Sequence, residues 1–330
     1  MNNTGRKIIV LLAVLVFLII VDAGTGSTSI GLNDLVRWIA GKTNETEKII
    51  IEQIRIPRVI TAVFAGMALG ISGLIMQTVF ENPLAGPYIL GISSGAGFGV
   101  AVSILGAGWA GINLQWAGYT TGAFAGALLV TIIILWLSYK YSSVIVLIAG
   151  VMLSGIFGAL TSVMQAFSSA EKLKSYILWT FGTTEAQNYE QLTFLALLTI
   201  IIFILAIVFS RSLDVLYLGE EQAQATGLNI KTAKILSLGS ISILTAAVTA
   251  LCGPIAFVGI ISPHLARAVV KDSRHKILLP ATAIIASIIV VSGDMISHAA
   301  TTGIPLNAIL SLIGIPVLLY FVLKGNNYIF

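Results

Sequence analysis

The sequence predicts an all-α polytopic membrane protein that crosses the bilayer about ten times. Hydrophobic residues make up 57% of its 330 positions and charged residues only 10%, and the mean hydropathy is +0.99. A soluble domain carries about a quarter charged residues, so this chain has more apolar surface than one aqueous core can hide. Apolar runs of about 20 residues, the length that a helix needs to cross a bilayer, recur along the whole chain.

The apolar runs define ten predicted transmembrane helices. They cover residues 8–26, 57–80, 88–107, 115–137, 144–166, 191–210, 232–251, 255–270, 277–298 and 305–324. The first run follows Arg6 and Lys7 as a signal peptide would, but it lacks a small-residue cleavage site and further spans come later. We therefore predict that it is a retained first helix, and we find no linker that would divide residues 1–330 into separate domains.

The positions of the basic residues predict the orientation. With ten spans, 11 of the 18 lysines and arginines lie on the side of the N-terminus and 7 on the other side. Because basic loops stay in the cytoplasm, both termini are predicted to be cytoplasmic. With nine spans, Lys324 would move to the opposite side and this bias would weaken.

Several classes of site are not expected from the residues present. The single Cys252 excludes an intrachain disulfide, and His264, His275 and His298 lack metal-ligand spacing. The glycine-rich run "SGAGFG" (94–99) has no preceding strand and no following Lys-Ser/Thr, so ATP binding by this chain is not predicted. No basic cluster is interleaved with aromatics, which argues against a nucleic-acid partner.

Glycines recur at a spacing of four in three predicted spans. Such a spacing gives a helix a smooth face on which a neighbouring backbone can approach closely. The glycines are Gly66 and Gly70, then Gly91, Gly95 and Gly99, and finally Gly118, Gly122 and Gly126.

The segment "QIRIPRV" (53–59) places Arg55 and Arg58 on one helix face at the outer end of the second span. Basic residues on the outer side run against the orientation rule. One interpretation is a docking site for an acidic partner, since guanidinium groups bind carboxylates bidentately. The other is a pair bound to lipid phosphate or to an internal acid. The residues alone leave both open.

The segment "SGDMISHAATTGIP" (292–305) holds Asp294 and His298 one turn apart near the outer end of the ninth span. An ionisable residue at membrane depth is a candidate functional group, and a stabilising pair on one helix face is the alternative. Asp294 or Glu81 would be the proton site if the chain were a proton-coupled secondary transporter.

A polar stretch, "LGEEQAQATGLNI" (218–230), interrupts the apolar chain once, and Arg211 and Lys231 place it in the cytoplasm. Gly219 and Gly227 fit the ends of a short helix whose positive N-terminus carries two glutamates. This helix is either an ordinary surface loop or a contact for a cytoplasmic partner.

Five motifs together resemble the permease subunits of iron-siderophore, haem and cobalamin ABC importers, the type II or FecCD-like group. They are "IRIPR" (54–58), "GISGLIMQTVFENPLAGPYILGISSGAGFG" (70–99), "LGEEQAQATGLNI" (218–230), "GPIAFVGIISPHLARAVVKDSRHKILLPA" (253–281) and "GIPLNAILSLIGIPVLLYFVLK" (303–324). The resemblance implies the type II permease fold of about ten helices per subunit, in the inner membrane of a bacterium. It also implies a homodimer, two cytoplasmic ATP-binding subunits and an extracytoplasmic substrate-binding protein. The chain itself would be no enzyme and would hold no cofactor, because ATP is used by the partner.

The resemblance also implies roles for particular residues. Helices at about 214–228 would couple to the ATPase, Arg55 and Arg58 would dock the binding protein, and the cytoplasmic gate would include two turns. The coupling residues are Leu218, Gly219, Glu220, Glu221, Ala223 and Gly227, and the gate residues are Leu84, Ser142 and Ser143. His298 stands where the family has a third docking arginine, which implies a weaker, pH-sensitive contact there. The motifs do not distinguish a ferric siderophore, haem or cobalamin as cargo.

Overall fold

The computed structural model describes residues 3–26, 31–106, 116–185, 188–299 and 303–324. Within these ranges the secondary structure is helical and contains no strand. The principal helices are α1 (Asn3–Gly24), α4 (Ile56–Val79), α5 (Ile92–Ala101), α7 (Trp116–Lys140), α8 (Ser143–Ala166), α10 (Tyr189–Val208), α13 (Ile230–Cys252), α14 (Val258–Val270), α15 (His275–Ala299) and α16 (Leu306–Lys324).

These helices confirm the predicted fold class. In the described part of the chain, eight helices are long and apolar enough to cross a membrane. Two shorter apolar helices, Ile92–Gly106 and Val258–Val270, coincide with the predicted spans 88–107 and 255–270. Both are short because the chain turns just before them: Gly91 is left-handed with φ +77° after the short helix η2 (Pro87–Leu90), and Phe257 is left-handed with φ +64°.

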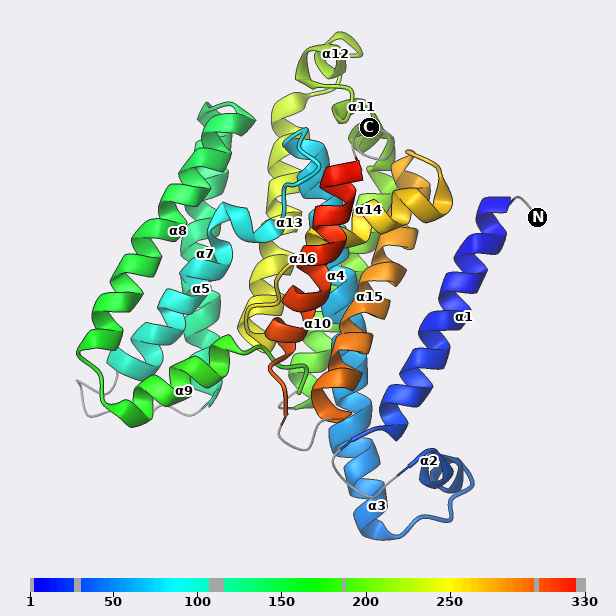
Figure 1. Ribbon diagram of the computed structural model, residues 1–330. Helices are drawn as coiled ribbons and strands as arrows, with labels where there is room; N and C mark the ends of the chain where they lie inside the picture. Colours follow the sequence, from blue (N-terminus) through cyan, green and yellow to red (C-terminus); the bar gives the residue numbers. More distant parts are fainter. Residues whose placement is uncertain (1–2, 27–30, 107–115, 186–187, 300–302, 325–330) are drawn as a thin grey trace.

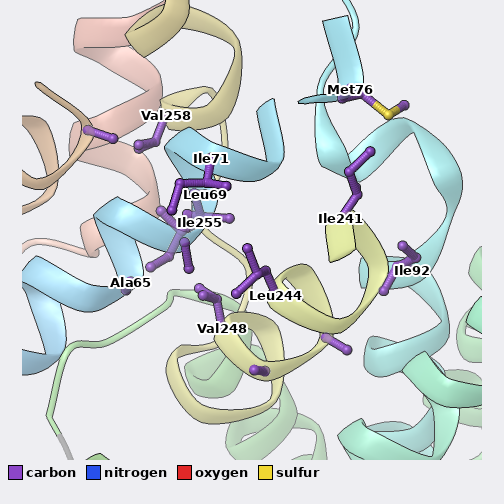
Figure 2. Packing of buried hydrophobic residues seen from close by; sticks show 14 of the residues in the cluster. Ala65, Leu69, Ile71, Met76, Ile92, Ile241, Leu244, Val248, Ile255 and Val258 are labelled. Carbon is purple, nitrogen blue, oxygen red and sulfur yellow. The ribbon is translucent and has the colours of Figure 1, made fainter. Parts of the chain in front are cut away.

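Helix α4 forms the centre of the bundle. It packs against α13, α14 and α15, whereas α1 lies at one flank and α5, α7 and α8 lie at the other (Figure 1). Its sequence is apolar on all sides, as expected for a helix surrounded by protein. Figure 2 shows Leu69 and Ile71 of α4 close to Leu244 and Val248 of α13, and all four are buried.

The predicted glycine faces are contacts between helices. A Cβ atom added to Gly99 of α5 would lie 1.9 Å from the carbonyl oxygen of Gly122 on α7, so the two backbones touch where side chains are absent. Gly66 of α4 meets the backbone of α15 in the same way, 2.6 Å from the Ala286 oxygen. The run 94–99 is therefore part of a helix–helix contact, as the lack of a phosphate-loop context predicted.

Short helices mark the two ends of the bundle. At one end lie α11 (Ser210–Leu216) and α12 (Glu220–Ala225), toward which α1 begins and α16 ends (Figure 1). At the other lie α2 (Leu32–Ile39), α3 (Glu45–Ile49) and α9 (Ala170–Thr180). The π-helical segment η1 (Ile50–Arg55) joins α3 to α4, so one continuous helix, Glu45–Val79, begins well before the predicted span 57–80. We call these the α12 end and the α2 end.

Candidate functional site

The polar stretch folds as predicted into a short helix bounded by two glycines. Gly219 precedes α12 with φ +101°, and Gly227 follows it with φ +85°, a backbone conformation that side chains disfavour. Ala223 is the buried residue of α12, whereas Leu218, Glu221 and Gly227 are exposed. The helix therefore packs on the bundle through Ala223, and most of its other side chains are exposed.

Glu220, the first residue of α12, connects this helix to two others. Its Oε1 atom accepts a hydrogen bond of 2.8 Å from Ser143 Oγ at the start of α8. The same oxygen lies 2.5 Å from Nζ of Lys234 in α13, whose side chain is buried. Ser142 precedes α8 as its N-cap residue without a side-chain cap. One predicted gate residue and one predicted coupling residue are thus in direct contact.

The turn between α4 and η2 lies against the start of α12. Asn82 Oδ1 accepts a hydrogen bond of 2.9 Å from the Leu84 nitrogen, so Asn82 closes this turn. A Cβ atom added to Gly219 would lie 3.6 Å from the Glu81 carboxylate. Leu84 itself is 41% exposed. We call Glu81, Ser143, Gly219, Glu220 and Lys234 the inner cluster, because they join the start of α12 to both predicted gate turns.

A second contact at the α12 end was missed from the sequence. His275, buried at the start of α15, bonds through its backbone nitrogen and its Nδ1 to Asp214 Oδ1, both at 2.7 Å. Its Nε2 lies 2.7 Å from Thr78 Oγ1 at the end of α4. Burial raises the pKa of Asp214, but the bonds from His275 outweigh it, so that pKa lies below its usual value. Since 61 residues separate Asp214 from His275, no local pattern signals this contact.

At the α2 end, both predicted docking arginines are buried. Arg58 is 3% exposed; its NH2 atom lies 3.1 Å from Asp22 Oδ1, and its Nε lies 2.9 Å from Asp294 Oδ2. Arg55 is 2% exposed and donates a hydrogen bond of 3.0 Å to the Ala23 oxygen. This is the arrangement of the internal-acid alternative for Arg58, and docking through these arginines stays a prediction. The sequence analysis did not single out Asp22.

Asp294 also binds His298, which in turn contacts the exposed Glu185. The chain of ion pairs that begins at Asp22 and Arg58 therefore reaches the surface. His298 Nδ1 lies 3.3 Å from Asp294 Oδ1, and its Nε2 lies 3.5 Å from Glu185 Oε1. The hydrogen bond with His298 holds the pKa of Glu185, which is largely exposed, below its usual value. Thr184 donates a hydrogen bond to Asp294. These contacts fasten α1, α4, α15 and the segment after α9 to one another.

A cavity of about 240 Å³ opens between α5, α8 and α9. Its lining consists of neutral side chains that donate or accept hydrogen bonds, together with aromatic rings and small residues. The lining residues are Ser93, Ser94, Gly97, Gly158, Thr161, Ser162, Gln165, Tyr176, Trp179, Thr180 and Pro254. Sequence analysis assigns no residue to such a cavity, because its walls come from segments far apart in the chain.

Comparison with known proteins places these features in context. The model of the FecCD transport family matches residues 13–324. The hemin transport system permease protein HmuU of Yersinia pestis is 33% identical and covers 96% of this chain and 95% of its own length. The cobalamin import system permease protein BtuC of Halobacterium salinarum is 32% identical over 84% and 74%. The molybdate import system permease protein MolB of Haemophilus influenzae is 30% identical over 94% of both chains.

A solved structure shares the architecture of the whole chain. It is described as an inward-facing conformation of a metal-chelate type ABC transporter, and it superposes with a TM-score of 0.84 at 27% identity. The superposition covers 98% of this chain and 100% of that one. The arrangement of helices is therefore that of an ABC transporter permease.

Proposed function

Because the chain belongs to the FecCD transport family and is an ABC importer permease, we propose that it carries a metal chelate inward: a ferric siderophore, haem or cobalamin. The observation that carries this proposal is the family match over residues 13–324, which includes both ends of the bundle and the cavity between α5, α8 and α9. The similarity to MolB keeps an oxyanion cargo as the alternative to be tested.

The neutral lining of the cavity supports a chelate as cargo. Ser162, Gln165 and Tyr176 offer hydroxyl and amide groups to the oxygen-rich surface of such a molecule, and Trp179 offers an aromatic face. A siderophore, haem or corrin ring brings the ligands of its own metal. The permease then needs hydrogen bonds and shape to hold the cargo, rather than carboxylates, thiolates or imidazoles.

The ATP-binding subunits are the proposed partners of the α12 end, which we infer to be cytoplasmic. The family implies ATP-binding subunits, and residues 214–228 are the segment that would contact them. Leu218 is 59% exposed at this end, although it is a large apolar side chain beside polar residues, which supports contact with another protein. Hydrolysis of ATP would take place in these subunits, and the permease would convert their closure into movement of its helices.

A second copy of the chain is the proposed partner of α8. Nothing lies within 4 Å of the position that a Cβ atom would take on Gly155 or Gly158 of this helix. Small residues on an open face of a membrane helix are typical of helix–helix contacts. The face beside them is apolar and exposed at Met152 and Ile156. A homodimer formed here would place the two cavities next to its axis.

The substrate-binding protein is proposed to dock at the α2 end, through Arg55, Arg58 and His298. Docking through Arg58 requires a carboxylate of the binding protein to take the place of Asp22 or Asp294. Docking through His298 would compete with Glu185 in the same way. Both exchanges would loosen the contacts that hold α1, α4 and α15 together, which would signal the arrival of cargo to the bundle.

Uptake by reconstituted vesicles tests the proposal. The chain is purified with its ATP-binding subunit, and its substrate-binding protein is added outside. Uptake of hemin, radiolabelled ferric citrate, cyanocobalamin and molybdate is measured with ATP inside. ATP-dependent uptake of one of the first three is expected. Uptake of molybdate alone would replace the chelate by an oxyanion, and uptake that follows a proton gradient without ATP would replace the importer by a secondary transporter.

A further inference from the structure

A single oxygen atom of Glu220 joins three helices. Ser143 Oγ donates to this Oε1 atom at 2.8 Å, and Lys234 Nζ lies 2.5 Å from it. Ser143 is the first residue of α8, Glu220 is the first of α12, and Lys234 lies in the second turn of α13. The three residues are 77 and 14 positions apart in the sequence, so their meeting is a tertiary contact.

Glu220 is also the residue through which α12 is bonded to the rest of the protein. Among the described residues, the side-chain hydrogen bonds and ion pairs that leave α12 for another helix are those of Glu220. Glu221 and the glutamines at 222 and 224 are exposed, and Ala223 contributes an apolar contact alone. The Glu220 carboxylate is therefore the side-chain link between α12 and α8 in the described part of the chain.

The charges make this contact persistent. The Lys234 side chain is 7% exposed, and Glu220 is the acid that it meets in the described part of the chain. A buried ammonium group without a partner is costly, which keeps the carboxylate in place. The hydrogen bond from Ser143 is strengthened by the negative charge of its acceptor. The pair is not fully sealed, because 36% of the Glu220 side chain remains exposed and can respond to a docked subunit.

We propose that Glu220 is a positioning residue of the transport cycle, which transmits the displacement of α12 to the first turn of α8 through Ser143 and is held in position by Lys234. This inference rests on the proposed importer function and names the contact through which α12 would act on a predicted gate turn. The Glu81 carboxylate lies beside Gly219, so the other predicted gate turn adjoins the same start of α12. A movement of the start of α12 would therefore reach both predicted gate turns at once.

The first test compares two neighbouring glutamates in the complete complex. Glu220→Gln keeps an acceptor for Ser143 but removes the charge that Lys234 needs, whereas Glu221→Gln removes an exposed charge from the same turn. Asp272→Asn, which removes an acid between α14 and α15, serves as the control with unchanged transport. The measured quantity is the number of hemin or ferric citrate molecules imported per ATP hydrolysed.

Ser143→Ala removes a hydrogen bond to the Glu220 carboxylate, and Glu220→Gln removes the charge that pairs with Lys234. Each is expected to lower this ratio about tenfold, the size of effect that loss of one charge-assisted contact gives, while ATP hydrolysis continues. Glu221→Gln is expected to change it far less. Equal ratios in the two glutamine variants would overturn the inference, because the charge of the helix end alone would then matter.

A charge exchange keeps the test decisive if Glu220→Gln does not assemble. In the double variant Glu220→Lys, Lys234→Glu, the pair is restored and Ser143 can accept a hydrogen bond from the new lysine. Recovery of the ratio above that of each single variant is expected, and failure to recover in a correctly assembled complex would overturn the inference. If the unmodified complex imports none of the probes with ATP, the proposed function itself is wrong, which is a different outcome.

Discussion

The Nε atom of Arg58 lies 2.9 Å from Oδ2 of Asp294, and both side chains are buried where α4 and α15 meet at the α2 end. Asp22 of α1 binds the same guanidinium through its NH2 atom. Removing this arginine takes the ion-pair partner from Asp22 and, in the described part of the chain, leaves Asp294 with His298 as its remaining basic partner. The contact therefore determines how these three helices stand relative to one another.

The stability of the isolated protein is expected to depend strongly on this arginine. Arg58→Gln should lower the free energy of unfolding by about 3–5 kcal/mol, because it breaks two buried ion pairs and takes from Asp22 its paired cation. Arg37→Gln is the matched control: Arg37 pairs with Asp34 at 3.4 Å but 63% of its side chain is exposed. Its loss should cost about 1 kcal/mol or less. Thermal unfolding in detergent measures both, and similar effects would show that the Arg58 pairs contribute little.

The lowered pKa of Asp214 predicts how the stability of the protein changes at acid pH. Its pKa is lowered in the folded protein by hydrogen bonds from His275, so it stabilises the fold above its ordinary pKa of 3.8, and this contribution disappears as the pH falls below that value. Because its side chain is 34% exposed, the contribution is modest, about 1 kcal/mol.

The corresponding experiment compares Asp214→Asn with the unmodified protein between neutral and acid pH. The variant should be less stable near neutrality, and the difference should shrink below about pH 4. Glu221→Gln, at an exposed position, should show no such trend. A difference that stays constant with pH would mean that the charge of Asp214 is not the stabilising feature.

The glycine contact between α5 and α7 should not tolerate a methyl group. Gly99→Ala would place Cβ 1.9 Å from the Gly122 oxygen, so the helices must separate, at a cost of about 1–3 kcal/mol. Gly239→Ala in α13 meets nothing within 4 Å and should instead stabilise the helix slightly. Thermal unfolding of the two variants distinguishes a close helix contact from a general effect of glycine replacement.

The helices could be predicted because apolar length is a local property. The contacts that matter at each end could not, because they join residues far apart in the sequence. The spacing of Arg55 and Arg58 places both on one helix face but does not identify the neighbour, and Asp22 stands 36 residues before Arg58. The glycines and glutamates of the sequence predicted the short helix α12, yet only the tertiary structure distinguishes Glu220, which binds Ser143, from the adjacent Glu221, which is exposed.

Gly227 offers a test of the coupling segment itself. Proline cannot adopt its φ of +85°, because the proline ring holds φ near −65°. Proline would also remove the 3.0 Å hydrogen bond that the Gly227 nitrogen donates to the Gln224 oxygen. Gly227→Pro should therefore distort the end of α12. ATP hydrolysis should no longer drive uptake of hemin or ferric citrate, while the affinity for the binding protein, which docks at the opposite end in our proposal, stays the same.

Gly41 provides the matched control at the α2 end. It has φ +68° and its nitrogen donates a 2.9 Å hydrogen bond to the Trp38 oxygen, so Gly41→Pro imposes the same kind of strain far from α12. This variant should keep uptake coupled to ATP. Equal loss of uptake in both variants would indicate general misfolding, and unchanged uptake in Gly227→Pro would mean that the segment after α12 does not transmit the ATPase movement.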